Sequence, residues 1–265
     1  MPVRAIRTFS NPMSFQPKFG QAADEFERYR PEYPPALLER ILRELSPARR
    51  LCAMDLGAGT GKFTRELVPH FREVIAVEPD PLMAGKIREQ FPQVLVRIAT
   101  AEDSSQAPAS ADLVAIANAL HWMDSVRVFA NAHLWLRPEG ILAVFDRPLP
   151  KASPEIDALV MAEFRGPWKP HRDPRLKRAR DWQALVRDAP GFAVVEEAKL
   201  PYVLPMTPAE YVGFWRSTSY GSAYARSLPA SESYWSELES RFRAASPDGM
   251  IPVDFSPTLL LARKI

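Results

Sequence analysis

Three glycines at alternate positions, Gly57, Gly59 and Gly61, follow a short apolar run and precede a segment with helical periodicity. This arrangement predicts a strand, a tight turn and a helix, because glycine has no Cβ and tolerates a positive φ angle. In such a turn the backbone can approach a ligand closely. Glu78 ends the next apolar run, where a carboxylate can accept hydrogen bonds from both hydroxyls of a ribose. Together the two features predict a site for a cofactor that contains a nucleoside.

The loop matches neither of two common phosphate-binding patterns. A dinucleotide loop has its third glycine at the position of Lys62, and a phosphate-cradling loop has glycine at the position of Leu56 and a hydroxyl at that of Phe63. Asp55, which lies inside the loop, would repel a pyrophosphate. We therefore expect a cofactor without phosphate and with a cationic amino-acid end, as S-adenosylmethionine has.

Apolar runs alternate with helical patterns through the first 146 residues. Strands are expected at about 51–56, 73–78, 94–98, 112–117 and 141–145, and helices near 61–71, 81–90 and 125–136. Such alternation predicts an α/β fold with a parallel, doubly wound sheet. Ligands of these sheets bind at the carboxyl ends of the strands, where the glycine loop and Glu78 converge.

Five segments occur in the order found in class I S-adenosylmethionine-dependent methyltransferases, and the chain resembles the small-molecule branch of that family. The segments are DLGAGTG at 55–61, VEPD at 77–80 with Met83, TAED at 100–103, NALHWMD at 118–124 and LRPEG at 136–140. Upstream, FG at 19–20 and YRPEYP at 29–34 resemble the N-terminal cap of the branch, whereas Glu139 stands where the family usually has glycine. The resemblance spans roughly residues 19–146. It implies a Rossmann-like sheet of seven strands, ordered 3-2-1-4-5-7-6, whose strand seven is antiparallel.

The chain divides into three expected parts. Residues 1–50 form N-terminal cap helices, with residues 1–18 as a mobile arm or a lid, and residues 51–146 form the cofactor-binding core. Residues 147–265 supply the last two strands together with a substrate cap, inserted at about 147–190 and 201–250. The prolines, 27 in the whole chain, cluster after residue 147 and predict a loop-rich second half.

The resemblance implies a set of residues for the cofactor. Asp55 would orient the loop near the methionine end, Glu78 would bind the ribose hydroxyls, and Asn118 would face the ammonium group. Arg30 would pair with the cofactor's carboxylate, which a guanidinium binds in a bidentate manner. Met83 could pack against adenine or belong to the core, and the TAED segment could contact adenine or form a plain polar turn. The expected cofactor-binding residues are Tyr29, Arg30, Asp55, Gly57, Gly59, Gly61, Glu78, Pro79, Met83, Ala101, Glu102, Asn118 and His121.

His121 is expected beside the transferred methyl group, where a histidine can act as a general base. The alternative is a structural histidine, and a carboxylate acceptor would need no base. Further along, Thr207, Pro208 and Glu210 predict a helix that begins with a capping box. The aromatic residues that follow could form core or line a pocket. The expected substrate-binding residues are Trp122, Trp215, Ser217, Tyr220 and Tyr224.

The composition is that of an ordinary soluble protein, with 46% hydrophobic and 25% charged residues. A net charge of +2 gives no strong electrostatic field for binding nucleic acid or a membrane surface. No apolar run reaches the roughly 18 residues of a membrane span. The basic run from Arg165 to Arg180 fits a solvated face better than a site for an acidic substrate or RNA. The single cysteine, Cys52, is expected to be buried and is compatible with the cytoplasm.

These observations predict an enzyme that methylates an oxygen or carbon atom of a small organic acceptor. We expect S-adenosylmethionine as the cofactor, no metal ion and no membrane partner. Two alternatives stay open: an RNA methyltransferase, and a relative that binds the cofactor without methylating anything. The sequence does not indicate the acceptor or the oligomeric state.

Overall fold

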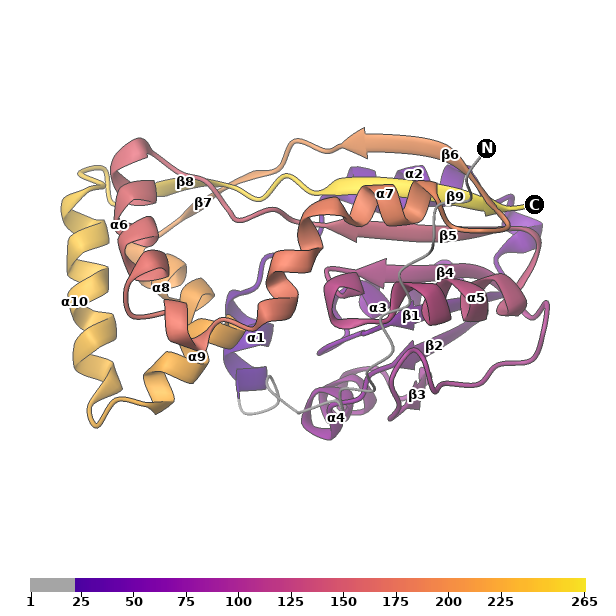
Figure 1. Cartoon of the computed structure of the whole chain (residues 1–265), viewed down its shortest axis with the longest axis horizontal. Helices are drawn as coiled ribbons and strands as arrows, with labels where there is room; N and C mark the ends of the chain where they lie inside the picture. The colour runs from indigo at the N-terminus through magenta and orange to yellow at the C-terminus, as the bar shows by residue number, and fades with distance from the viewer. Residues whose placement is uncertain (1–21) are drawn as a thin grey trace, which may run out of the picture.

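The computed structural model describes residues 22–265, and for residues 177–180 it describes the backbone alone. The arm or lid expected at residues 1–18 and the FG pair at 19–20 lie outside the described residues. Within residues 22–265, seven strands form one sheet with the order β3-β2-β1-β4-β5-β9-β6 (Figure 1). The strands are β1 (Cys52–Leu56), β2 (Glu73–Val77), β3 (Leu95–Arg97), β4 (Ala111–Ala117), β5 (Leu136–Asp146), β6 (Phe192–Lys199) and β9 (Thr258–Lys264).

The strand pairing confirms the expected topology. Neighbouring strands from β3 to β5 run parallel, and β9 lies antiparallel between β5 and β6. The last strand of the chain therefore occupies the position of strand seven in the expected order. One difference lies in β5, which begins at Leu136 rather than 141 and passes through Glu139 in a left-handed conformation (φ +63°). This conformation is rare for a residue with a Cβ, which explains why glycine suits the position.

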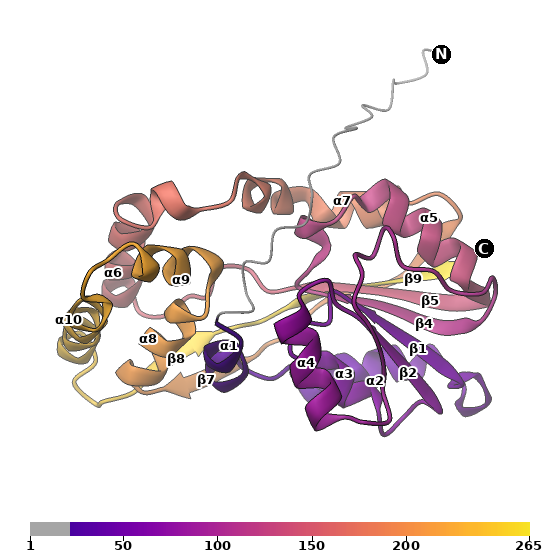
Figure 2. The ribbon, with the colours of Figure 1, turned by 90° about the horizontal axis from the view of Figure 1, so that it is seen from below.

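Helices cover both faces of the sheet, which Figure 2 shows edge-on. Along β1, Cys52, Met54 and Leu56 pack on the side of α5 and α7, whereas Ala53 packs on the side of α2, α3 and α4. Because side chains alternate along a strand, a strand buried on both faces is mostly apolar, and Asp55 is the one polar residue of β1. The helices of these two layers are α2 (Pro35–Arg43), α3 (Lys62–Leu67), α4 (Pro81–Gln90), α5 (Ser125–Trp135) and α7 (Trp182–Arg187).

A separate cap lies beyond the carboxyl ends of the parallel strands, and β5 leads directly into it (Figure 1). Its aromatic-rich core includes Trp168, Tyr211, Phe214, Trp215 and Trp235. The cap contains α6 (Pro154–Arg165), α8 (Pro208–Arg216), α9 (Ser219–Arg226), α10 (Ser231–Ala244), β7 (Val203–Met206) and β8 (Ile251–Asp254). Helix α1 (Ala23–Tyr29) packs against α8 and joins this cap to the sheet.

Side-chain caps fix the starts of several helices, among them α4, α5 and α8. Asp80 accepts a hydrogen bond from the backbone N–H of Leu82 at the start of α4, and Asp124 accepts one from Val126 at the start of α5. At α8, Thr207 and Glu210 exchange the reciprocal bonds of a capping box, as expected from the sequence. These caps satisfy N–H groups that have no partner within their own helix.

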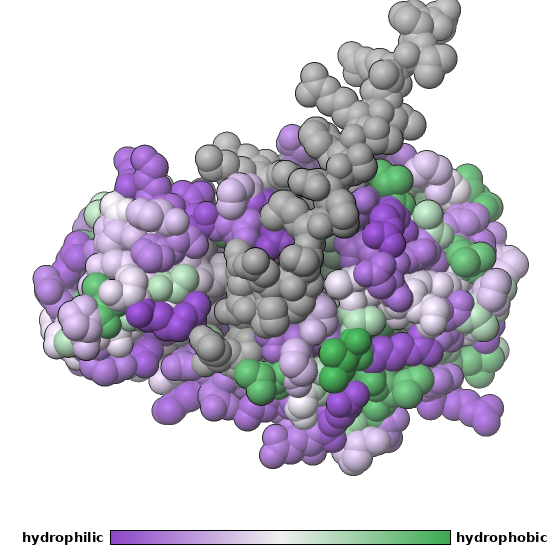
Figure 3. Space-filling model, turned by 60° about the horizontal axis from the view of Figure 1, so that its bottom comes forward, coloured by the Kyte–Doolittle hydropathy of each residue, from purple (hydrophilic) through white to green (hydrophobic). Residues whose placement is uncertain are grey.

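Figure 3 shows one face of the molecule, on which hydrophilic residues predominate and hydrophobic residues form small groups between them. No helix within residues 22–265 combines the length and the apolar composition that a membrane crossing requires.

Two glycines in helices give a matched test of how α1 docks on the cap. A Cβ at the buried Gly213 of α8 would overlap with the ring of Tyr29, whereas a Cβ at Gly85 of α4 would meet nothing within 4 Å. We expect Gly213→Ala to lower the free energy of unfolding by about 1–3 kcal/mol through overpacking. Gly85→Ala should raise it by up to about 1 kcal/mol, since alanine is the better helix former. Urea unfolding measures both, and equal effects of the two substitutions would contradict the docking of Tyr29 on α8.

Candidate active site

The glycine loop is held between the end of β2 and the segment that follows β4. Gly57, Gly59 and Gly61 have φ angles of +70°, +60° and +93°. A Cβ at Gly57 would lie 2.7 Å from the Cβ of Ala119, so only glycine fits there. The N–H of Gly57 donates to the carbonyl of Val77 over 2.8 Å, which ties the loop to β2. The backbone of the loop is thus fixed at the carboxyl edge of the sheet.

Glu78 links this loop to the start of α4. One carboxylate oxygen accepts the N–H of Gly59 at 2.8 Å and the other accepts the N–H of Asp80 at 2.9 Å. Pro79 lies between Glu78 and this helix cap. Burial raises the pKa of Glu78 to about 7, although both backbone hydrogen bonds oppose the shift. A buried carboxylate therefore stands at the end of β2, where the sequence predicted it.

Asp55 is a second buried acid at this edge. Its Oδ2 accepts the hydroxyl of Thr64 at 2.7 Å, whereas its Oδ1 and the hydroxyl of Thr60 are buried without a hydrogen-bond partner among the described residues. Burial raises the pKa of Asp55 to about 6. Buried polar atoms normally have partners, so the two orphaned oxygens indicate a place for a polar ligand or water.

Arg30 and Tyr29 face the cap. The Nε of Arg30 donates to the Oγ of Ser217 at 2.9 Å, and its guanidinium lies over the rings of Phe26 and Phe214. Burial lowers the pKa of Arg30 to about 10. The ring of Phe26 lies 3.7 Å from the position of a Cβ on Gly59, so α1 stands between the glycine loop and the cap.

Asn118 adopts a left-handed conformation (φ +51°) just after β4. Its Nδ2 donates to the hydroxyl of Tyr33 at 2.8 Å, and its Oδ1 accepts the backbone N–H of Arg147 at 2.7 Å. The guanidinium of Arg147 in turn donates to the carbonyls of Pro31 and Glu32. The Asn118 side chain thus holds the N-terminal segment against the ends of β4 and β5.

The residues expected to contact adenine lie in α4 and in a loop that hydrogen bonds fix to α5. Met83 and Ala101 are buried in α4 and in the loop after β3. Glu102 accepts the backbone N–H of Asp124 at 2.6 Å, and Asn131 donates to the carbonyls of Ala101 and Glu102. The loop is therefore fixed to the start of α5. Contact of these residues with adenine stays a prediction.

His121 lies in a short 3-10 helix, η3 (Leu120–Trp122), and its side chain is 13% exposed. Burial lowers the pKa of His121 to about 4, helped by Arg175 and Arg30 and opposed by Asp173. The imidazole is therefore neutral near pH 7 and able to accept a proton. Its Nδ1 lies 3.9 Å from Oδ2 of Asp146, which ends β5.

Three residues near this edge were not predicted from the sequence: Tyr33, Asp146 and Arg147. Tyr33 lies in the YRPEYP segment but was given no role, Asp146 and Arg147 belong to no assigned motif, and the Tyr33–Asn118 bond spans 85 residues of chain. One signal was available for Asp146. It is the titratable residue that directly follows the apolar run of β5, and the carboxyl end of that strand faces the ligand side of the sheet.

The residues expected to contact an acceptor lie in different surroundings. The guanidinium of Arg175 lies 4.7 Å from the ring centre of Trp122. The hydroxyl of Ser217 accepts a hydrogen bond from Arg30. Trp215 has no exposed surface and packs within the cap core, Tyr220 is 8% exposed, and Tyr224 is half-buried. Their contact with an acceptor stays a prediction.

The basic run is largely involved in local contacts where its side chains are described. Arg175 binds Asp173 through two hydrogen bonds of 3.0–3.1 Å, and Arg172 lies 3.8 Å from the ring centre of Phe164. A long basic stripe is therefore not found among the described side chains from 165 to 176.

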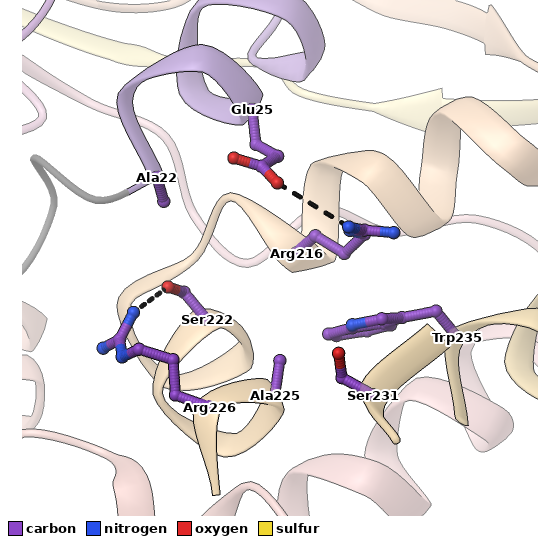
Figure 4. Close-up of a pocket in the computed structure, with 8 residues that line it drawn as sticks. All are labelled: Ala22, Glu25, Arg216, Ser222, Ala225, Arg226, Ser231 and Trp235. Carbon is purple, nitrogen blue, oxygen red and sulfur yellow. Dashed lines mark hydrogen bonds and ion pairs between the residues drawn. The ribbon is translucent and has the colours of Figure 1, made fainter. Parts of the chain in front are cut away.

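A hollow lies between α1 and the cap helices α8, α9 and α10 (Figure 4). Glu25 and Arg216 pair across it at 3.7 Å, and Trp235 forms part of its wall. None of its lining residues comes from the carboxyl edge of the sheet, so it is separate from the glycine loop and His121.

Comparisons with known proteins agree with this geometry. A family model described as a methyltransferase domain matches residues 54–144. An uncharacterized methyltransferase of Mycobacterium tuberculosis is 40% identical over 126 residues, which make up 48% of this chain and 50% of the relative. A probable S-adenosylmethionine-dependent methyltransferase of Saccharomyces cerevisiae is 34% identical over 125 residues, covering 44% of this chain and 43% of the relative. The chain thus spans about half the length of the curated relatives it matches.

A solved structure extends the similarity over the cap. A presumptive type II methyltransferase from Anaeromyxobacter dehalogenans has a TM-score of 0.71 and 29% identity, covering 89% of this chain and 98% of that one. These similarities, over the methyltransferase domain at residues 54–144 and over the fold, support a class I S-adenosylmethionine-dependent methyltransferase with S-adenosylmethionine as its cofactor.

The residues of the methyltransferase fit that cofactor. The glycine loop approaches the end of β4 so closely that a Cβ on Gly57 would fill the space, and two orphaned oxygens, on Asp55 and Thr60, face no partner among the described residues. Lys62, which follows the glycine loop, is paired with Glu32 at 2.9 Å. The buried acids Asp55 and Glu78 at this edge suit a cofactor that has a cationic amino-acid end and no phosphate.

The raised pKa of Glu78 predicts how the stability of the cofactor-free protein depends on pH. Because its pKa in the folded state, about 7, exceeds the ordinary 4.5, the folded state holds more protons between these values, and stability falls as pH rises through that window. Relative to wild type, Glu78→Gln should gain up to about 3 kcal/mol of unfolding free energy between pH 4.5 and pH 7. Urea unfolding across this range measures the difference, and parallel pH curves for the two proteins would refute a raised pKa.

Proposed function

We propose that this methyltransferase transfers a methyl group from S-adenosylmethionine to an oxygen or carbon atom of a small organic acceptor in the cytoplasm. The observation that carries the proposal is the common position of the glycine loop, Glu78 and His121 at one carboxyl edge, beneath a cap. When bound, the cofactor supplies a methyl group already activated on a sulfonium. The protein then has to orient the acceptor and exclude water.

Four residues at or near the carboxyl edge bind different parts of the cofactor in this proposal. The carboxylate of Glu78 binds the ribose hydroxyls, and the orphaned Oδ1 of Asp55 accepts a hydrogen bond from the methionine end or its water. Arg30, already buried between two aromatic rings, binds the methionine carboxylate with the hydrogens that Ser217 leaves free. Asn118 keeps its backbone strained and fixed beside the ammonium group.

The acceptor is proposed to lie between His121 and the cap residues Ser217 and Tyr220. His121 is neutral at pH 7 because of its burial, so it can take a proton from a hydroxyl or an activated carbon. Its neighbour Trp122 is held by Arg175, which comes from the cap side. A small acceptor fits this arrangement better than RNA does, since Arg175 is bound to Asp173 and Arg172 is stacked on Phe164.

Calorimetry with S-adenosylmethionine and S-adenosylhomocysteine tests the proposed cofactor site. We expect both to bind, and Glu78→Ala to weaken binding by about 100-fold, because two hydrogen bonds to a charged group are lost. Glu73→Ala is the matched control, since Glu73 is exposed at the opposite end of the same strand. Failure of the folded wild-type protein to bind either compound would refute the proposal.

The proposed base is tested by turnover. An extract supplied with cofactor carrying a labelled methyl group should contain a product heavier than its acceptor by one methylene, and that acceptor is then used in the assay. His121→Ala should reduce kcat by about 100-fold to 10,000-fold while the affinity for S-adenosylhomocysteine is unchanged. Unchanged turnover in the variant would remove His121 as the base and leave positioning as the source of the rate.

A further inference from the structure

Asp146 and His121 form a largely buried pair at the carboxyl edge of the sheet. Asp146 ends β5, His121 follows the adjacent strand β4, and their side chains are 21% and 13% exposed. Oδ2 of Asp146 lies 3.9 Å from Nδ1 of His121, a distance that a small rotation of either side chain reduces to a hydrogen bond. Nδ1 is buried and has no hydrogen-bond partner within the described part of the chain.

We propose that Asp146 is a positioning residue that accepts the Nδ1 proton of His121 and thereby presents Nε2, unprotonated, as the base. The two nitrogens lie on different sides of the imidazole ring, so a ring with Nδ1 towards Asp146 directs Nε2 away from Asp146. The bond also fixes the plane of the ring. The inference rests on the proposed function in one respect: a base is needed only if the acceptor loses a proton during methyl transfer.

The cost of an unpartnered buried N–H supports this pairing. A buried polar atom without a partner costs about 1–3 kcal/mol, so Nδ1 is stabilised by any acceptor within reach. Of the carboxylates near the ring, Asp173 is already held by two hydrogen bonds from Arg175. Asp146 is the carboxylate within ion-pair distance of Nδ1.

The charges around the pair favour a neutral ring. Arg175 and Arg30 face His121 and disfavour its protonation, whereas Asp173 favours it. Arg147 and Tyr33 face Asp146. Burial raises the pKa of Asp146 to about 7, against the opposing backbone N–H and charge of Arg147. The pair therefore releases one proton to solvent as the pH rises through neutral, without forming a stable imidazolium.

The position of that proton depends on pH. Below about pH 7 a protonated Asp146 donates to Nδ1, and the ring carries its own proton on Nε2, where it blocks the base. Above that pH an ionised Asp146 accepts from Nδ1–H, and Nε2 has a free lone pair. During transfer, the acceptor's bond to hydrogen breaks, Nε2 takes the proton, and the acceptor's electron pair forms the new bond to the methyl carbon while the carbon–sulfur bond breaks. The ionised Asp146 then stabilises the imidazolium that forms.

The tautomer of His121 can be observed in the whole protein without cofactor or acceptor. In protein with ¹⁵N-labelled histidine, long-range ¹H–¹⁵N correlation distinguishes a protonated ring nitrogen from one with a lone pair. His121→Gln assigns the signal among the four histidines of the chain. Between about pH 5.5 and about pH 8.5 we expect the proton to move from Nε2 to Nδ1. A lone pair on Nδ1 at about pH 8.5 in the wild-type protein would overturn the proposal.

Two variants separate Asp146 from its surroundings. Asp146→Asn should abolish the pH-dependent change of tautomer, because the amide does not titrate. The matched control, Asp173→Asn, should retain the change, since Asp173 is the other carboxylate that acts on His121. A change that persists in Asp146→Asn, or that disappears only in Asp173→Asn, would refute the assignment. If Asp146→Asn does not fold, a ¹³C carboxyl titration of wild-type Asp146 must show the same midpoint as the tautomer change.

Failure of this inference is distinct from failure of the proposed function. The tautomer is measured in the cofactor-free protein, whereas the cofactor site is tested by calorimetry. Protein that binds S-adenosylhomocysteine but keeps the His121 proton on Nε2 up to about pH 8.5 would retain the proposed methyl transfer and lose the role of Asp146.

Discussion

The contacts of the Arg147 guanidinium hold together the side of the sheet on which ligands are expected to bind. It leaves the end of β5, donates to the carbonyls of Pro31 and Glu32, and lies 4.2 Å from the ring centre of Tyr33, whose hydroxyl is bonded to Asn118. A buried guanidinium with several acceptors fixes the direction of the chain around it. Because Arg30 precedes this segment directly, the same contacts place α1 between the sheet and the cap. One buried cation therefore positions both the carboxyl edge of the sheet and the helix α1 that leads to the cap.

The carboxyl edge contains three buried acids, Asp55, Glu78 and Asp146, and burial raises the pKa of each of them. These groups lower the stability of the fold, since a buried carboxylate that titrates near neutral pH costs free energy. Perturbed acids gathered at one edge are typical of a functional site. Their positions at the ends of β1, β2 and β5 explain this grouping, because parallel strands bring their carboxyl ends to one side of the sheet.

The family resemblance predicted the sheet order. Local patterns sufficed to predict the glycine loop, the position of Glu78 and the capping box of Thr207, because each depends on neighbours in sequence or on a motif with fixed spacing. The helical cap was expected, but the details of its packing were not. The contact of Asn118 with the ammonium group, through its backbone carbonyl or its side chain, stays a prediction, whereas the bonds of its amide to Tyr33 and to the backbone of Arg147 were not predicted. Such bonds join segments 29 and 85 residues apart, and no periodicity within one segment encodes them.

The aromatic residues of the cap show why acceptor recognition is hard to infer from composition. Trp168, Tyr211 and Trp215 are fully buried in a core that is separate from both faces of the sheet. A cap that extends beyond the sheet must bury its own apolar surface to be stable, and large aromatic rings do so with few residues. The cap's contribution to specificity therefore has to come from the polar atoms it directs towards the sheet edge. Arg30, Ser217 and Arg175 are the described groups that link cap and edge, so the chemistry of the acceptor is constrained by hydrogen bonds and charge more than by an aromatic wall.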